Sequence, residues 1–122
     1  MPVGPNRRSG PSEQVSGLSA GAGRVYLNIK RSGSYTIVAI CDEELLGKTL
    51  RDGRLVFHIS EEFYGGQLMD VDTALQIAAQ YSVVNMVGEK VVSRAIELGM
   101  VHKAAVIRIS GVPHAMILKT WI

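Results

Sequence analysis

Two apolar segments near the start of the chain constrain the fold more than any other feature. Between residues 24 and 30 (RVYLNIK), apolar residues alternate with polar or charged ones, a pattern typical of a strand with one face in water. Residues 35–40 (YTIVAI) are nearly all apolar or β-branched, which predicts an interior strand. The segment 31–34 contains a glycine and predicts a turn, so we expect the two strands to form a hairpin.

The middle of the chain has the pattern of two helices. The first helix is expected to begin at Asp70 or Asp72, whose carboxylates suit an N-cap, and to end at Tyr81. A second helix is predicted from about residue 85 to residue 98, because apolar residues recur there with a 3.6-residue period. Gly99 suits the left-handed conformation that ends many helices.

Further strands and turns complete the prediction. A third strand over residues 55–59 follows a turn at 51–54, and a fourth covers residues 104–109. A turn at 111–113 precedes a fifth strand over residues 114–122. Together these elements predict an α+β fold, with a mostly antiparallel sheet of about four to five strands and two main helices packed on one face.

Two short segments link these elements. Asp42 suits the N-cap of a short helix that ends at Leu46, with Glu43 and Glu44 in the first turn, where the helix dipole favours acids. Residues 61–66 (EEFYGG) are expected to be a loop.

The first 23 residues differ from the rest of the chain. Glycine, proline and serine make up about half of them, and no hydrophobic period is present. We therefore divide the chain into a flexible, basic N-terminal arm, residues 1–23, and a single domain, residues 24–122. The arm is either a dispensable leader or a segment that becomes ordered on an acidic partner such as RNA.

Composition excludes several classes of protein. The single cysteine, Cys41, rules out an internal disulfide and a multi-cysteine zinc site, and a cytoplasmic location is the expectation. No run of 18 or more apolar residues is present, so we expect no membrane partner. No nucleotide-binding glycine motif is present and no two histidines lie four residues apart, so neither a cofactor nor a metal is expected. The net charge of +2 is compatible with nucleic acid but does not require it.

Glycine, proline, charged and aromatic residues coincide in four short islands at the predicted element boundaries. The islands are residues 41–48 (CDEELLGK), 61–66 (EEFYGG), 85–90 (NMVGEK) and 111–115 (GVPHA). Binding and catalytic residues are concentrated at such boundaries. The same residues also have structural explanations, since glycines form turns and adjacent acids are usually solvated.

The islands also carry a resemblance to a known family. The segments IVAICDEELLGK (residues 37–48), EFYGG (62–66), NMVGEK (85–90) and IRISGVPHA (107–115) resemble the archaeal domain-of-unknown-function family 424. The likeness covers roughly residues 24–116. It implies an association with RNA and translation, and it gives no catalytic residues to transfer.

Charge placement and this resemblance favour a small, non-catalytic protein that binds RNA or a ribonucleoprotein such as the ribosome. A basic strand face interleaved with an aromatic suits irregular or single-stranded RNA, and the arm adds two arginines. The residues expected to contact RNA are Arg7, Arg8, Arg24, Tyr26, Lys30 and Arg31. A second contact surface is expected from Tyr64, Gly65, Gly66, Gly88, Glu89, Lys90, Pro113 and His114.

Two other functions are compatible with the same residues. The first is a small enzyme or ligand-binding domain, with a site formed by the glycine-rich loops around His114, Gly88 and Cys41. That function predicts a concave pocket where the islands meet and a histidine with a displaced pKa. The second is a protein–protein adaptor in which the aromatic loop at Phe63 and Tyr64 is the anchor.

Overall fold

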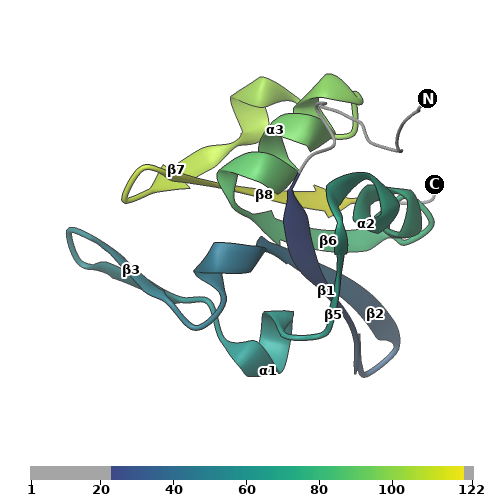
Figure 1. Cartoon of the computed structure of the whole chain (residues 1–122), viewed down its shortest axis with the longest axis horizontal. Coiled ribbons are helices and arrows are strands. Elements are labelled where there is room, and N and C mark those ends of the chain that lie inside the picture. Colours follow the sequence, from purple (N-terminus) through teal and green to yellow (C-terminus); the bar gives the residue numbers. More distant parts are fainter. Residues whose placement is uncertain (1–22, 120–122) are drawn as a thin grey trace, which may run out of the picture.

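A six-stranded mixed sheet forms the centre of the molecule (Figure 1). The computed structural model describes residues 23–119. The strand order is β5-β1-β2-β6-β8-β7, and all neighbours are antiparallel except β2 and β6. The strands of this sheet are β1 (Arg24–Ser32), β2 (Tyr35–Asp42), β5 (Gln67–Asp70), β6 (Val83–Val87), β7 (Ile107–Ile109) and β8 (Val112–Leu118).

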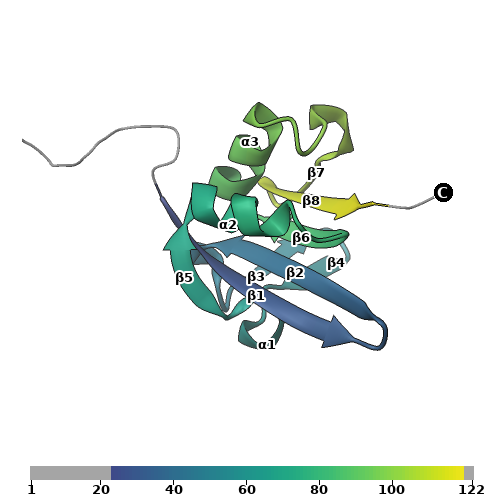
Figure 2. The same cartoon turned by 90° about the vertical axis from the view of Figure 1, so that its right-hand side faces the viewer.

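Shorter elements cover both faces of this sheet. Figure 2 shows α2 and α3 on one side and α1 on the other. The helices are α1 (Glu61–Tyr64), α2 (Val71–Ala78) and α3 (Glu89–Glu97), with single 3₁₀ turns η1 (Glu43–Leu45) and η2 (Lys103–Ala105). A separate hairpin, β3 (Thr49–Asp52) and β4 (Leu55–His58), extends from the body and lies on the α1 side (Figure 1).

The alternation in β1 divides the apolar side chains between two cores. Val25 and Leu27 face α2 and α3, in a main core shared with Val38 and Ile40 of β2. The opposite face carries Tyr26, which packs into a second core. The second core contains Ala39, Cys41, Leu45, Ile59, Tyr64 and Val87. Because β2 contributes to both cores, it is buried on both faces from Val38 to Asp42, and it lies between β1 and β6, which confirms the predicted interior strand.

The structure confirms an α+β fold with a mostly antiparallel sheet, but it corrects the numbers of elements. The main sheet has six strands rather than four to five, and three helices cover two faces rather than two covering one. Strands β3 and β5 were not predicted, because four residues are too few to establish a period of two. None of the helices in the described part of the chain has the length and apolar character that crossing a bilayer requires.

The prediction of a helix from residue 85 was wrong at its start. Residues 83–87 form β6, which pairs in parallel with β2, and α3 begins only at Glu89. Five consecutive residues of this segment (VVNMV) suit a strand covered on both faces, and tertiary pairing decided between strand and helix. Gly88 separates the two elements, with φ of +127°. The predicted end at Gly99 is confirmed, with φ of +75°.

Several boundaries also shift by a few residues. The expected loop at 61–66 contains the one-turn helix α1, and the expected strand at 104–109 is a 3₁₀ turn followed by β7. The turn placed at 111–113 is formed by Ser110 and Gly111, both with positive φ, as in the two-residue turns that suit hairpins. Pro113 lies within β8. Of the two candidate caps for the first helix, Asp70 is the one that accepts a hydrogen bond, from the Thr73 amide.

Asp42 caps a helix other than the one expected. Its side chain makes no capping bond to η1. Instead, its carboxylate accepts hydrogen bonds from the amide N–H of Lys90 at 2.8 Å and of Val91 at 3.0 Å, both in the first turn of α3. Asp42 is only 1% exposed, so this contact ties the end of β2 to the start of α3 inside the protein.

Replacement of Gly88 by alanine tests this contact. A Cβ at Gly88 would lie 2.3 Å from Cγ of Asp42, and the backbone conformation strongly favours glycine. We expect Gly88→Ala to lower the free energy of unfolding by roughly 2–5 kcal/mol in urea denaturation. Gly99→Ala is the matched control, because its φ is also positive but no heavy atom lies within 4 Å of its Cβ position. The control should lose about 1–2 kcal/mol, and equal losses would contradict the steric argument.

Candidate functional site

The four islands meet at one end of the central strands. Cys41 at the end of β2 pairs with Val87 of β6, and Val87 pairs in turn with His114 of β8. Tyr64 of α1 packs against the same region from the second core. The sequence gives no means of knowing that the islands converge, because their separations along the chain range from about twelve to twenty residues or more.

A hydrogen-bonded group lies at the centre of this junction. The hydroxyl of Tyr64 donates to Oδ1 of Asn85, and Nε2 of His114 lies 3.1 Å from the same oxygen. Because an amide oxygen can only accept, Nε2 of His114 carries the proton. The three side chains therefore fix one another across α1, β6 and β8.

Aromatic contacts connect this group to the hairpin. The ring of Phe57, in β4, packs edge-on against Tyr64 at 6.5 Å and against His114 at 5.5 Å between ring centroids. Backbone hydrogen bonds add a second attachment, from the Gly47 amide to the Ile59 carbonyl and from the Ile59 amide to the Lys48 carbonyl. The junction therefore holds the base of the β3–β4 hairpin in a defined position.

The titratable groups of the junction are poorly suited to nucleophilic catalysis. Burial raises the pKa of Cys41 to about 12, so the thiol stays protonated at neutral pH. Burial also raises the pKa of Tyr64 and lowers that of His114. The predicted displacement of a histidine pKa is thus present, but its cause is burial in a packed aromatic group rather than a neighbouring charge.

A small cavity of about 140 Å³ lies beside the junction. Three carboxylates line it, and each has a partner. Asp42 caps α3, Glu44 pairs with Lys90 at 3.2 Å, and Glu89 pairs with Arg108 at 3.2 Å. The remaining lining residues are Leu45, Gly111, Val112 and Pro113. Within residues 23–119, no three His, Cys, Asp or Glu side chains are grouped so as to hold a metal ion.

The predicted RNA-binding residues do not form one continuous surface. Arg24 pairs with Glu43 at 2.9 Å, and Tyr26 is half-buried in the second core. Lys30 and Arg31, at the far end of β1, make no ion pair with a carboxylate in the described part of the chain. Arg7 and Arg8 lie outside the described residues.

The predicted second surface is divided between the interior and the exterior. Tyr64, Gly88 and Pro113 are buried, and His114 is half-buried. Gly65 and Gly66 are required by close packing, since a Cβ at either position would lie within 2.5 Å of a backbone oxygen. Glu89 and Lys90 are exposed but belong to the ion pairs described above. Burial also removes Tyr64 from the surface anchor considered for an adaptor.

Sequence reasoning missed the cations of the β3–β4 hairpin. Lys48, Arg51 and Arg54 are all exposed, but residues 51–54 were interpreted only as a turn. A usable signal was present, because Asp52-Gly53 between two short β-prone segments is a strong indication of a two-residue hairpin. The two turn residues are Gly53 and Arg54, so Arg54 lies in the turn itself and Arg51 lies in β3.

Comparison with known proteins places the chain in a family. The model of the family described as "Protein of unknown function (DUF424)" matches residues 30–120. The chain belongs to this family. Its fold is also similar to a crystal structure of an uncharacterized conserved protein from Methanopyrus kandleri, with 33% sequence identity and a TM-score of 0.68. That similarity covers 81% of this chain and 96% of the other. A comparison with curated proteins gave no match.

The lowered pKa of His114 predicts a pH dependence of stability. The unfolded chain protonates this ring near its ordinary pKa of 6.5, whereas the folded protein does so only at lower pH. The neutral His114 ring therefore contributes to the free energy of unfolding above about pH 6.5. This contribution is lost as the pH falls from 6.5 through the pKa that His114 has in the folded protein. Urea unfolding should show a smaller loss between about pH 7.5 and pH 5 for His114→Gln than for the wild type. An NMR titration midpoint for His114 at or above 6.5 would contradict this assignment.

Proposed function

We propose that this DUF424 protein is a non-catalytic RNA-binding protein whose β3–β4 hairpin makes the principal contact with RNA phosphates. The observation that carries the proposal is a concentration of exposed, unpaired cations on the hairpin. Lys48, Arg51 and Arg54 are exposed, and none forms an ion pair with a carboxylate within residues 23–119. Two acids lie nearby. Asp52 accepts a hydrogen bond from the Ser110 amide at 2.8 Å, and Glu44, whose charge interacts with Lys48, forms its ion pair with Lys90.

Half of the cations in the described part of the body differ from those of the hairpin. Each of four makes an ion pair that reduces its attraction for phosphate: Arg24 with Glu43, Lys90 with Glu44, Arg94 with Asp72 and Glu97, and Arg108 with Glu89. When an unpaired cation contacts a phosphate, it displaces a counterion from the nucleic acid. The release of these counterions is the main source of affinity in nucleic-acid binding. The distribution of pairs therefore favours the hairpin over the α3 surface.

The shape of the hairpin also suits this function. It is separate from the main sheet and extends from the body (Figure 1). Leu55 and Val56 are about half exposed beside the cations, at 50% and 54%, and can contact ribose or bases. A β-ribbon with cationic side chains can enter a groove or follow a strand. Since Phe57 fixes its base, little ordering is needed on binding.

We assign the partner to RNA in a ribonucleoprotein such as the ribosome, and the protein to the cytoplasm. Support comes from the association of the resembled family with translation and from the buried free thiol of Cys41, which agrees with a reducing compartment. A ligand-binding centre has less support, because the carboxylates of the small cavity are partnered and Cys41 is protonated.

Charge neutralisation on the hairpin tests the proposal. The variant Lys48→Gln/Arg51→Gln/Arg54→Gln should weaken binding to a labelled RNA, measured by fluorescence anisotropy. The slope of log affinity against log salt should fall in magnitude by about 2, for the loss of three phosphate contacts.

A matched control removes the same formal charge from cations that are already paired. The variant Arg24→Gln/Lys90→Gln/Arg108→Gln should bind RNA with nearly unchanged salt dependence. Equal loss of affinity in the two triple variants would exclude the hairpin as the principal contact. No binding by the wild type at low salt would overturn the proposed function itself.

A further inference from the structure

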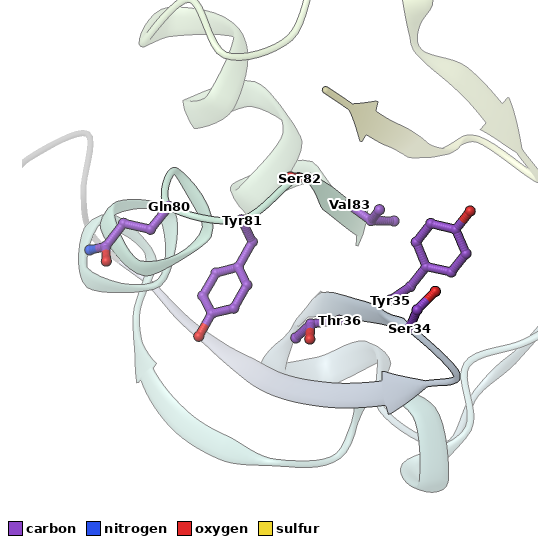
Figure 3. A pocket seen from close by; sticks show the side chains of 7 residues that line it. All are labelled: Ser34, Tyr35, Thr36, Gln80, Tyr81, Ser82 and Val83. Atoms are coloured by element: carbon purple, nitrogen blue, oxygen red, sulfur yellow. The ribbon is translucent and has the colours of Figure 1, made fainter. Parts of the chain in front are cut away.

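A pocket of about 290 Å³ opens at the beginning of β2 and β6, at the opposite end of β2 from the hairpin (Figure 3). Two loops form it, the β1–β2 turn and the segment between α2 and β6. Its walls are Ser34, Tyr35, Thr36, Gln80, Tyr81, Ser82 and Val83. None of the four islands contributes to it.

The lining combines aromatic rings with uncharged polar groups. Figure 3 shows the rings of Tyr35 and Tyr81 on either side of Thr36. Tyr35 is 66% exposed, whereas Tyr81 packs partly against the main core. Apart from Val83, every lining residue has a polar side chain, and none of these side chains hydrogen-bonds to another residue within 23–119. Their donors and acceptors are therefore available to a ligand.

Cations flank this neutral lining. Arg31 is the cross-strand partner of Thr36, so the two side chains lie on the same face of the sheet. Lys30 pairs with the next residue of β2 and lies on the opposite face, the face of Tyr26. On the other side, Lys119 donates its amide to the Ser82 carbonyl at 2.8 Å and its Nζ to the Ala79 carbonyl at 2.7 Å. No carboxylate of the described chain pairs with these three cations.

We propose that this pocket binds one unpaired nucleobase, and that its cationic rim contacts the adjoining phosphates. The inference rests on the proposed RNA-binding function and deepens it, because it specifies single-stranded RNA. A base is flat, uncharged and carries both donors and acceptors, which matches the exposed ring of Tyr35 beside hydroxyl and amide groups. Bases in a duplex are stacked and paired, so they cannot enter a pocket of this size. Tyr35, as the more exposed ring, provides the stacking surface.

Substitution of Tyr35 tests the pocket without disturbing the core. Tyr35→Ala should lower affinity for a single-stranded RNA of mixed sequence by about 5- to 100-fold, while leaving the salt slope unchanged. Tyr35→Phe should retain most of the affinity, because the ring is kept. Leu98→Ala is the control, since it removes another exposed apolar side chain, at 48% exposure, from the end of α3. Binding of an RNA duplex should be the same in all four proteins.

A second experiment uses the four free nucleoside monophosphates. They should shift the NMR amide resonances of Thr36 and Ser82 in the wild type, and less in Tyr35→Ala. Such shifts in a protein that binds no RNA would support the pocket and overturn the proposed function. A different outcome would overturn the base-binding proposal and retain the proposed function. In that outcome the hairpin variant weakens RNA binding, Tyr35→Ala leaves it unchanged, and the nucleotides cause no shifts. Equal binding of single-stranded and duplex RNA would also overturn the pocket.

Discussion

The buried carboxylate of Asp42 is the contact on which the arrangement of the molecule depends. It accepts two amide N–H groups from the first turn of α3, where an oxygen acceptor satisfies donors that the helix itself cannot. The approach is close enough that only glycine fits at position 88, and the Gly88 amide donates to the Pro113 carbonyl of β8. Asp42 thus joins β2 to α3, and Gly88 joins the same place to β8. These two contacts involve residues from three of the four islands.

The second core fixes the position of the β3–β4 hairpin relative to the main sheet. Asn85 receives hydrogen bonds from both Tyr64 and His114, and Phe57 packs on both of those rings. The hairpin that carries Phe57 has no strand pairing with the main sheet, so side-chain packing, together with the contacts at its base and with β7, sets its position. The residues considered for a catalytic site in sequence therefore support the base of the β3–β4 hairpin in the structure.

The distribution of ion pairs says more about the surface of this protein than its net charge does. A net charge of +2 gives little indication of a nucleic-acid partner. Ion pairs neutralise much of the α3 surface. Within residues 23–119, the cations without a carboxylate partner lie on the hairpin and near the pocket beside Tyr35, apart from Lys103 in η2. These two places lie at opposite ends of β2, so an RNA that contacted both would follow an extended path along the molecule.

The sequence by itself determined the local elements whose signal lies within a few residues. The alternation of β1, the apolar run of β2 and the glycine end of α3 all follow from side-chain chemistry and backbone preference, and all are confirmed. The sequence left both Asp70 and Asp72 as candidate caps of α2, and the structure selects Asp70. Tertiary structure decided whether residues 83–87 became strand or helix, because the segment is apolar enough for both and only the parallel pairing with β2 favours a strand. It also decided which helix Asp42 caps and which cations remain unpaired. Those outcomes depend on contacts between residues that lie 19 to 49 positions apart, and no local pattern encodes them.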